Sequence, residues 1–222
     1  MNSTKCTSCG LVNFVNDEAC RRCGGHLMAG YAPLTDRVEV HDDRRGFWEY
    51  ILWASGVTIT ILGLGYGSLL YTSEPLTADE RKVVTDAVRV LDESGFSQQT
   101  FALRHLVSFR RTDHWWNRYV GHQTAYAATN FPFGIVTLYP TFFKYPVDER
   151  EHATILLHES YHLFGDGEEK ALERVWKEKQ RLGWTAARYG STRVFKNTRE
   201  WTSGSVPSLF TCGADGQSDC LE

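Results

Sequence analysis

The chain has 222 residues, of which 42% are hydrophobic, 13% aromatic and 23% charged, and its formal net charge is −3 at pH 7. This composition excludes collagen-like, low-complexity and wholly disordered chains. The balance of charge gives no support for a nucleic-acid partner, which usually goes with a strongly basic domain. The distribution along the chain is more informative, because four of the six cysteines lie within residues 1–23 and one long uncharged run follows.

The first segment carries two Cys-x-x-Cys pairs, Cys6 with Cys9 and Cys20 with Cys23. Each pair can direct two thiolates at one point, and two pairs complete a tetrahedral zinc site. Two disulfides are the alternative, but a gap of two residues between cysteines is unfavourable for a structural disulfide. The segment also has too few apolar residues to fold without a metal or a covalent cross-link. The pattern predicts a structural zinc ribbon over residues 1–28, followed by a solvated linker over 29–46.

Residues 50–71 form a run without a charged side chain. As a helix this run is about 33 Å long, enough to cross a hydrocarbon core of roughly 30 Å. A buried core helix is the alternative, but glycines weaken such a helix in water, whereas membranes tolerate them. We expect a single transmembrane helix over residues 47–72 and a short linker over 73–78. Aromatic residues that favour the membrane interface lie near both ends, namely Trp48, Tyr50, Trp53 and Tyr71.

Small residues recur along one face of this helix, and Gly63 and Gly67 form a G-x-x-x-G pair. That spacing lets two helix backbones approach closely. It predicts a homodimer through Gly63 and Gly67, with the general frequency of glycine in membrane helices as the plainer explanation.

The remaining residues, 79–222, show mixed helical and strand patterns. An N-cap pattern over residues 76–80 and the apolar periodicity that follows predict a helix that stops at Gly95. β-rich runs follow at 101–109, 119–129 and 134–143. Two helices are expected over 148–164 and 168–182, separated by a glycine-rich turn. The tail after Gly183 is polar and has no clear period. The whole pattern predicts an α+β domain.

The first of these two helices contains His158-Glu159-Ser160-Tyr161-His162, an H-E-x-x-H motif. On a helix, the two histidines lie one turn apart on one face and can share a metal. Glu159 is offset by about 100°, so its carboxylate can stand beside the metal, take a proton from a metal-bound water and pass it to the leaving amine. A surface helix with two stray histidines is the alternative, but the apolar residues 153–157 favour a helix that crosses a core.

Catalytic zinc normally has three protein ligands, and the candidates for the third are Glu168, Glu169 and Glu173. The last two have Lys and Arg neighbours and indicate solvated positions. A carboxylate on the core face of a helix is costly unless it binds a metal or a partner, which favours Glu168. That face is shared with Ala171, Leu172, Val175 and Trp176.

The complete spacing H-E-x-x-H-x-x-G-x-x-E, from His158 to Glu168, resembles that of the metzincin peptidases, with Glu in place of their usual third His. A glutamate ligand at the start of the following helix resembles the gluzincins. These resemblances imply a small zincin-like domain, a β-sheet with an active-site helix, that acts as a zinc-dependent endopeptidase on a peptide or protein substrate. In zincins an edge strand before that helix binds the substrate by β-addition. This assigns the role to residues 134–143, with a plain core strand equally open.

An oxyanion-stabilising residue is expected after the third ligand. Tyr189 and Arg193 are candidates for stabilising an oxyanion. The ribbon, through its Cys spacing and Asn13, resembles the zinc ribbons of bacterial membrane proteins and the Ran-binding-protein-type zinc finger.

Cysteine usage predicts the topology. A thiolate zinc site suits a reducing cytoplasm, whereas Cys212 and Cys220, eight residues apart in a Gly/Asp/Ser loop, suit a disulfide in an oxidising compartment. We expect a cytoplasmic ribbon and an extracytoplasmic catalytic domain, periplasmic if the protein is bacterial. The expected function is that of a membrane-anchored zinc endopeptidase with one catalytic and one structural zinc. The alternative is a membrane-bound sensor or scaffold with structural zinc sites and no catalysis.

Overall fold

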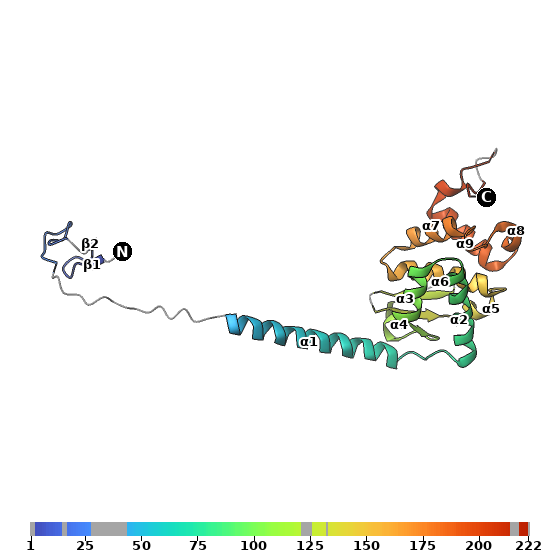
Figure 1. Ribbon diagram of the computed structural model, residues 1–222, viewed down its shortest axis with the longest axis horizontal. Helices are drawn as coiled ribbons and strands as arrows, with labels where there is room; N and C mark the ends of the chain where they lie inside the picture. The colour runs from blue at the N-terminus through green and yellow to red at the C-terminus, as the bar shows by residue number, and fades with distance from the viewer. Residues whose placement is uncertain are drawn as a thin grey trace. The chain divides into compact units, whose positions relative to one another are not determined.

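The computed structural model describes residues 3–14, 17–27, 44–120, 126–131, 133–213 and 218–221. The chain divides into two compact units, residues 1–57 and 58–222 (Figure 1). Most of the linker predicted over 29–46 and part of the β-rich run at 119–129 lie outside the described residues.

The N-terminal unit contains a hairpin of β1 (Ser3–Lys5) and β2 (Val12–Phe14), which pair in antiparallel fashion. Its small core consists of Cys6, Cys20 and Leu27, with Cys9 and Leu11 packed against them. A core of this size is too small to hold a fold by hydrophobic burial, as the sequence predicts.

The long helix α1 (Arg44–Tyr71) contains an apolar stretch from Gly46 to Tyr71, about 39 Å long. By length and composition this stretch can cross a membrane, and its most apolar part is not buried. The large apolar side chains exposed along it include Leu52, Trp53, Ile59, Ile61, Leu62 and Leu64. A core helix of a soluble domain would bury such side chains, so the exposure argues against that alternative.

The C-terminal unit is a mixed α+β fold, as the sequence predicts. After the second half of α1 it continues with α2 (Ala78–Glu93) and α3 (Ser97–His105). A capping box between Thr77 and Glu80 closes the N-terminus of α2. The described sheet has the order β3-β5-β4, with β3 (Ser108–Arg110) parallel and β4 (Ala127–Asn130) antiparallel to β5 (Ile135–Leu138). In sequence, the short helix α4 (Trp115–Val120) lies between β3 and β4, and the short helix α5 (Pro140–Lys144) follows β5.

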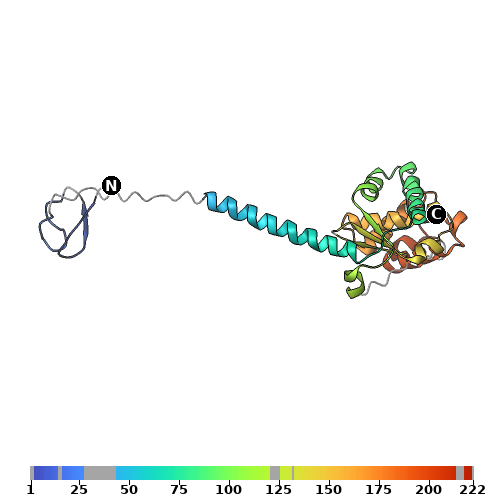
Figure 2. The ribbon, with the colours of Figure 1, turned by 90° about the horizontal axis from the view of Figure 1, so that it is seen from below.

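The second half of this unit is helical and begins with α6 (Glu149–Leu163), which is followed by α7 (Glu168–Glu178). The chain continues through α8 (Ala186–Tyr189), α9 (Arg193–Ser205) and the 3-10 turn η1 (Pro207–Phe210). Cys212 and Cys220 are joined by the predicted disulfide, which closes the tail. Figure 2 shows the same elements from below.

The structure corrects two expectations about this unit and decides between two alternatives that the sequence left open. Residues 101–105 belong to helix α3, because Thr100, Ala102 and Leu103 form its buried face while Phe101 is exposed. For residues 134–143 the core strand is the correct alternative over Ile135–Leu138, since β5 is the central, fully buried strand, and Pro140 begins α5. The tail contains the amphipathic helix α9, whose buried stripe includes two threonines beside Val194 and Phe195, which hides the apolar period.

Candidate metal centres

Helix α6, which carries the H-E-x-x-H motif, runs through the core of the C-terminal unit. The Asp148 side chain caps its N-terminus by accepting hydrogen bonds from the N–H groups of Arg150 and Glu151. Ten of its residues are buried, among them Ala153, Leu156 and Leu157. This burial fixes the helix, so the histidines near its C-terminal end are held in place by the core.

The structure brings together the three predicted metal ligands. The Nε2 atoms of His158 and His162 are 3.1 Å apart, and the Glu168 carboxylate lies 3.4 Å from the first and 3.2 Å from the second. The donor atoms all lie within 4.8 Å of one another. Glu168 is the first residue of α7, as expected for a ligand that opens the following helix.

The turn between α6 and α7 explains how Glu168 reaches the histidines. Gly165 has φ +83°, a conformation that favours glycine. The N–H of Asp166 donates to the carbonyl of Tyr161 and the N–H of Gly165 donates to that of His162, which is the Schellman pattern of a helix C-terminus. The chain thus reverses within a few residues and returns α7 to the histidine face.

Asp166, which sequence reasoning missed, ties the ligands to α7. Its carbonyl accepts a hydrogen bond from Nδ1 of His162 at 2.8 Å, which leaves Nε2 for the metal. Its carboxylate forms ion pairs with Lys170 at 2.5 Å and Arg174 at 3.0 Å, both on α7. The only sequence signal was its place between two glycines, which predicts a turn and no contact.

The three donors of this cluster interact strongly with one another. Burial alone would lower the pKa of His162, but hydrogen bonds to the Glu168 carboxylate and the Asp166 carbonyl raise that pKa to about 9. Hydrogen bonds from both histidines hold the pKa of Glu168 far below its usual range. A metal would have to displace the proton that these groups share. Two imidazoles and a carboxylate that meet at one point form a donor set suited to Zn²⁺.

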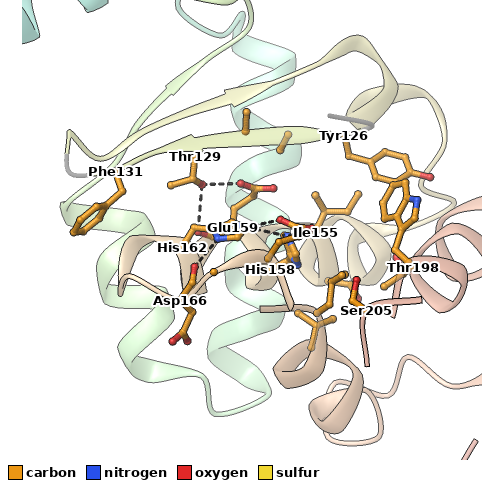
Figure 3. Close-up of a pocket in the computed structure, with 18 of the residues that line it drawn as sticks. Tyr126, Thr129, Phe131, Ile155, His158, Glu159, His162, Asp166, Thr198 and Ser205 are labelled. Atoms are coloured by element: carbon orange, nitrogen blue, oxygen red, sulfur yellow. Dashed lines mark hydrogen bonds and ion pairs between the residues drawn. The ribbon is translucent and has the colours of Figure 1, made fainter. Parts of the chain in front are cut away.

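Glu159 stands beside this cluster without belonging to it. Its side chain is buried, with 4% of the residue exposed, and Oε2 accepts a hydrogen bond from Oγ1 of Thr129 at 2.7 Å. Thr129 lies on β4, one of the two edge strands of the described sheet. Figure 3 shows the two side chains facing each other next to His162. No sequence signal distinguishes Thr129 from other residues of its β-rich run.

A cavity of about 870 Å³ opens at the candidate metal site. Tyr126 and Phe131, from either end of β4, lie on opposite sides of Glu159 and His158 (Figure 3). The ring of Tyr126 packs on that of Trp201 in α9, with centroids 5.9 Å apart. The apolar part of the lining also includes Ile155, Leu172 and Val175.

The structure does not bring the two oxyanion candidates to this cavity. Tyr189 is buried, and its hydroxyl donates to Asp148 Oδ2 at 2.7 Å, at the opposite end of α6 from His162. The guanidinium of Arg193 lies over the ring of Tyr145, 3.9 Å from its centroid.

The four cysteines of the N-terminal unit form a second cluster, and their sulfur atoms also lie within 4.8 Å of one another. The two pairs sit in turns with the same hydrogen bonds. Cys6 N–H donates to the carbonyl of Leu11 and Cys20 N–H to that of Gly25, while the carbonyls of the two cysteines accept from the residues four positions on, which are glycines. All four cysteines are free, which agrees with a metal site and not with disulfides.

Asn13 supports the second of these turns. Its side-chain amide donates to Sγ of Cys20 at 3.6 Å, and its Oδ1 accepts from the N–H of Arg21 at 3.1 Å. The backbone N–H of Arg22 lowers the pKa of the Cys20 thiol to about 6. Such donors favour the thiolate that zinc binds.

The arrangement offers two candidate metal sites of different kinds, one with four sulfur donors and one with two imidazoles and a carboxylate beside a buried glutamate and a cavity. Comparisons of the chain with models of known protein families, with curated proteins and with solved structures found no match.

Proposed function

We propose that the protein is a membrane-anchored, zinc-dependent endopeptidase. The observation that carries this proposal is the placement of Glu159, which adjoins the donor cluster, is buried, and is held by Thr129 instead of taking part in the cluster. A purely structural metal site has no use for a buried carboxylate in this position, whereas hydrolysis requires a general base there.

His158, His162 and Glu168 would hold the zinc, which supplies a Lewis acid for the scissile carbonyl. Glu159 accepts the proton of the attacking water and delivers it to the leaving amine. The Thr129 hydroxyl binds one carboxylate oxygen of Glu159, so that the carboxylate is held in one orientation during both transfers.

The strand β4 supports a peptide as the substrate. It is one of the two edge strands of the described sheet, and the hydrogen bond from Thr129 places it directly against Glu159. An extended peptide that pairs with the outer edge of β4 would run past the donor cluster. This replaces the role that the sequence assigns to residues 134–143. The apolar side of the cavity, with Ile155, Leu172 and Val175, favours a substrate with an apolar side chain next to the cleaved bond.

The anchor of this enzyme is α1, with a single crossing of the membrane. The free cysteines of the ribbon and the disulfide of the C-terminal tail support a cytoplasmic ribbon and an extracytoplasmic peptidase domain.

The test uses the full-length chain in lipid vesicles, with zinc content and hydrolysis of a quenched-fluorescent peptide library as readouts. We expect two zinc ions per chain, one for each cluster. Glu159→Gln should keep both and lose hydrolysis, and His158→Ala should lose one zinc and hydrolysis. The matched control is Glu169→Gln, an exposed neighbour of Glu168 that should change neither.

Loss of zinc from Glu159→Gln would contradict the separation of base and ligands. Wild-type hydrolysis by Glu159→Gln would refute the peptidase. Full zinc binding without any hydrolysis by the wild-type chain would favour the sensor or scaffold.

A further inference from the structure

The short helix α4 exposes a large part of three aromatic side chains. Trp115 is 45% exposed, Trp116 43% and Tyr119 80%. Their rings form a row, with centroids 5.7 Å apart for the first pair and 5.9 Å for the second. A contiguous aromatic patch of this kind marks an interaction surface.

This patch is attached to the last turn of α1. The indole Nε1 of Trp115 donates to Oγ of Ser68 at 3.1 Å, and its backbone N–H donates to Oγ1 of Thr72 at 3.2 Å. Arg118 donates to the carbonyl of Thr72 at 3.3 Å. Both views place α4 beside the C-terminal end of α1 (Figures 1 and 2). The depth of α4 is therefore set by that end of the helix.

The length of α1 gives this depth. The apolar stretch from Gly46 to Tyr71 is about 39 Å long, whereas the hydrocarbon core measures roughly 30 Å. A centred helix therefore extends a few ångströms beyond the hydrocarbon at each end. The turn from Ser68 to Tyr71 lies in that margin, and α4 lies beside it at the level of the lipid headgroups. Trp and Tyr favour this layer because each ring has an apolar body and a polar atom.

We propose that α4 is a second membrane contact, through which Trp115, Trp116 and Tyr119 enter the interfacial layer of the bilayer and seat the C-terminal unit on the lipid surface. The inference rests on the membrane span of the proposed function, but not on catalysis. This contact also sets the height of β4 above the membrane. Nε2 of His114, directly before α4, lies 3.4 Å from the side-chain amide of Asn130 at the end of β4. The strand that would receive the substrate is thereby held at a set distance from the membrane.

The experiment places the photo-cross-linker p-benzoylphenylalanine at one position of the full-length chain in phosphatidylcholine–phosphatidylglycerol vesicles. Tyr119 is the test position, and Leu64, exposed within α1, is the positive control. Val147, between α5 and α6, is the negative control, because it is also apolar and exposed but does not belong to the aromatic row of α4. After irradiation, mass spectrometry identifies what each position has captured. We expect phospholipid adducts at Tyr119 and Leu64, and none above background at Val147.

Four results would overturn the proposal. Lipid capture at Leu64 but not at Tyr119 would remove the α4 contact and leave the span in place. Equal capture at Val147 would show that lipid contact is not specific to α4. A cross-link from Tyr119 to a second copy of the chain would assign the patch to a protein interface. Absence of lipid at Leu64 would refute the span and the α4 contact together, while the Glu159→Gln assay would still decide the peptidase.

Discussion

Replacement of Thr129 by valine tests the positioning of the proposed general base. Valine has nearly the same shape and favours strands, so β4 should keep its structure. The variant loses the 2.7 Å hydrogen bond from Oγ1 to the Glu159 carboxylate. A hydrogen bond to a charged group contributes about 1.5–3 kcal/mol, and about 1.4 kcal/mol corresponds to a tenfold change in rate. If the bond acts mainly on the orientation of Glu159, kcat should fall by about tenfold to a hundredfold.

The assay measures kcat and KM of the full-length variant on the best peptide of the library, together with its zinc content. Zinc should stay unchanged because Thr129 is not a ligand, and KM should change little. The control is Thr129→Ser, which keeps the hydroxyl and should retain most of the activity. A valine variant with wild-type kcat, or a serine variant as slow as valine, would refute the assigned role of this hydroxyl.

Three other changes test the metal sites and the helix α1. Gly165→Ala puts a side chain on a residue with φ +83°, at a cost of about 1–2 kcal/mol. Competition with a chelator should show that this variant binds zinc more weakly. The control is Gly167→Ala, at φ −73° and in open space, which should change zinc affinity far less. Cys6→Ser should lose the structural zinc and the ordered amide resonances of residues 3–27, with hydrolysis unchanged; a folded, chelator-insensitive ribbon would contradict the zinc site. Gly67→Ile should weaken cross-linking between copies in membranes, and an equal loss in Leu62→Ile would contradict a glycine-specific contact.

The candidate sites were predictable where their donors are close in sequence. His158 and His162 are one helical turn apart, so the helix alone brings them together. Glu168 follows within six residues, and Gly165 indicates the turn that returns it to the histidines. The four cysteines lie in two short turns. The burial of Ala171 and Val175 on α7 confirms the apolar stripe, but the Glu168 side chain is 64% exposed, so the cost of a buried carboxylate, on which its choice depended, does not apply to it.

The contacts that the sequence did not reveal join elements far apart along the chain. Thr129 and Glu159 are thirty residues apart, and only the strand order β3-β5-β4 places Thr129 at the edge beside α6. The β-rich run 134–143 suggested an edge strand because Pro140 suits one, yet a proline also suits the first turn of a helix, which is where it lies. A local pattern cannot tell the centre of a sheet from its edge, because the difference lies in the neighbouring strands.

The two clusters differ in a way that bears on their roles. In the ribbon, four thiols lie close together, and the two turns that hold them carry matching hydrogen bonds. Four protein donors would fill a tetrahedral zinc site and leave no position for a substrate. In the C-terminal unit, three donors lie at the wall of a cavity, with Glu159 to one side. A four-coordinate metal held by these three donors would leave one position for water or substrate. Donor number, supported by the position of Glu159, therefore distinguishes a site that stabilises a fold from one that can act on a substrate.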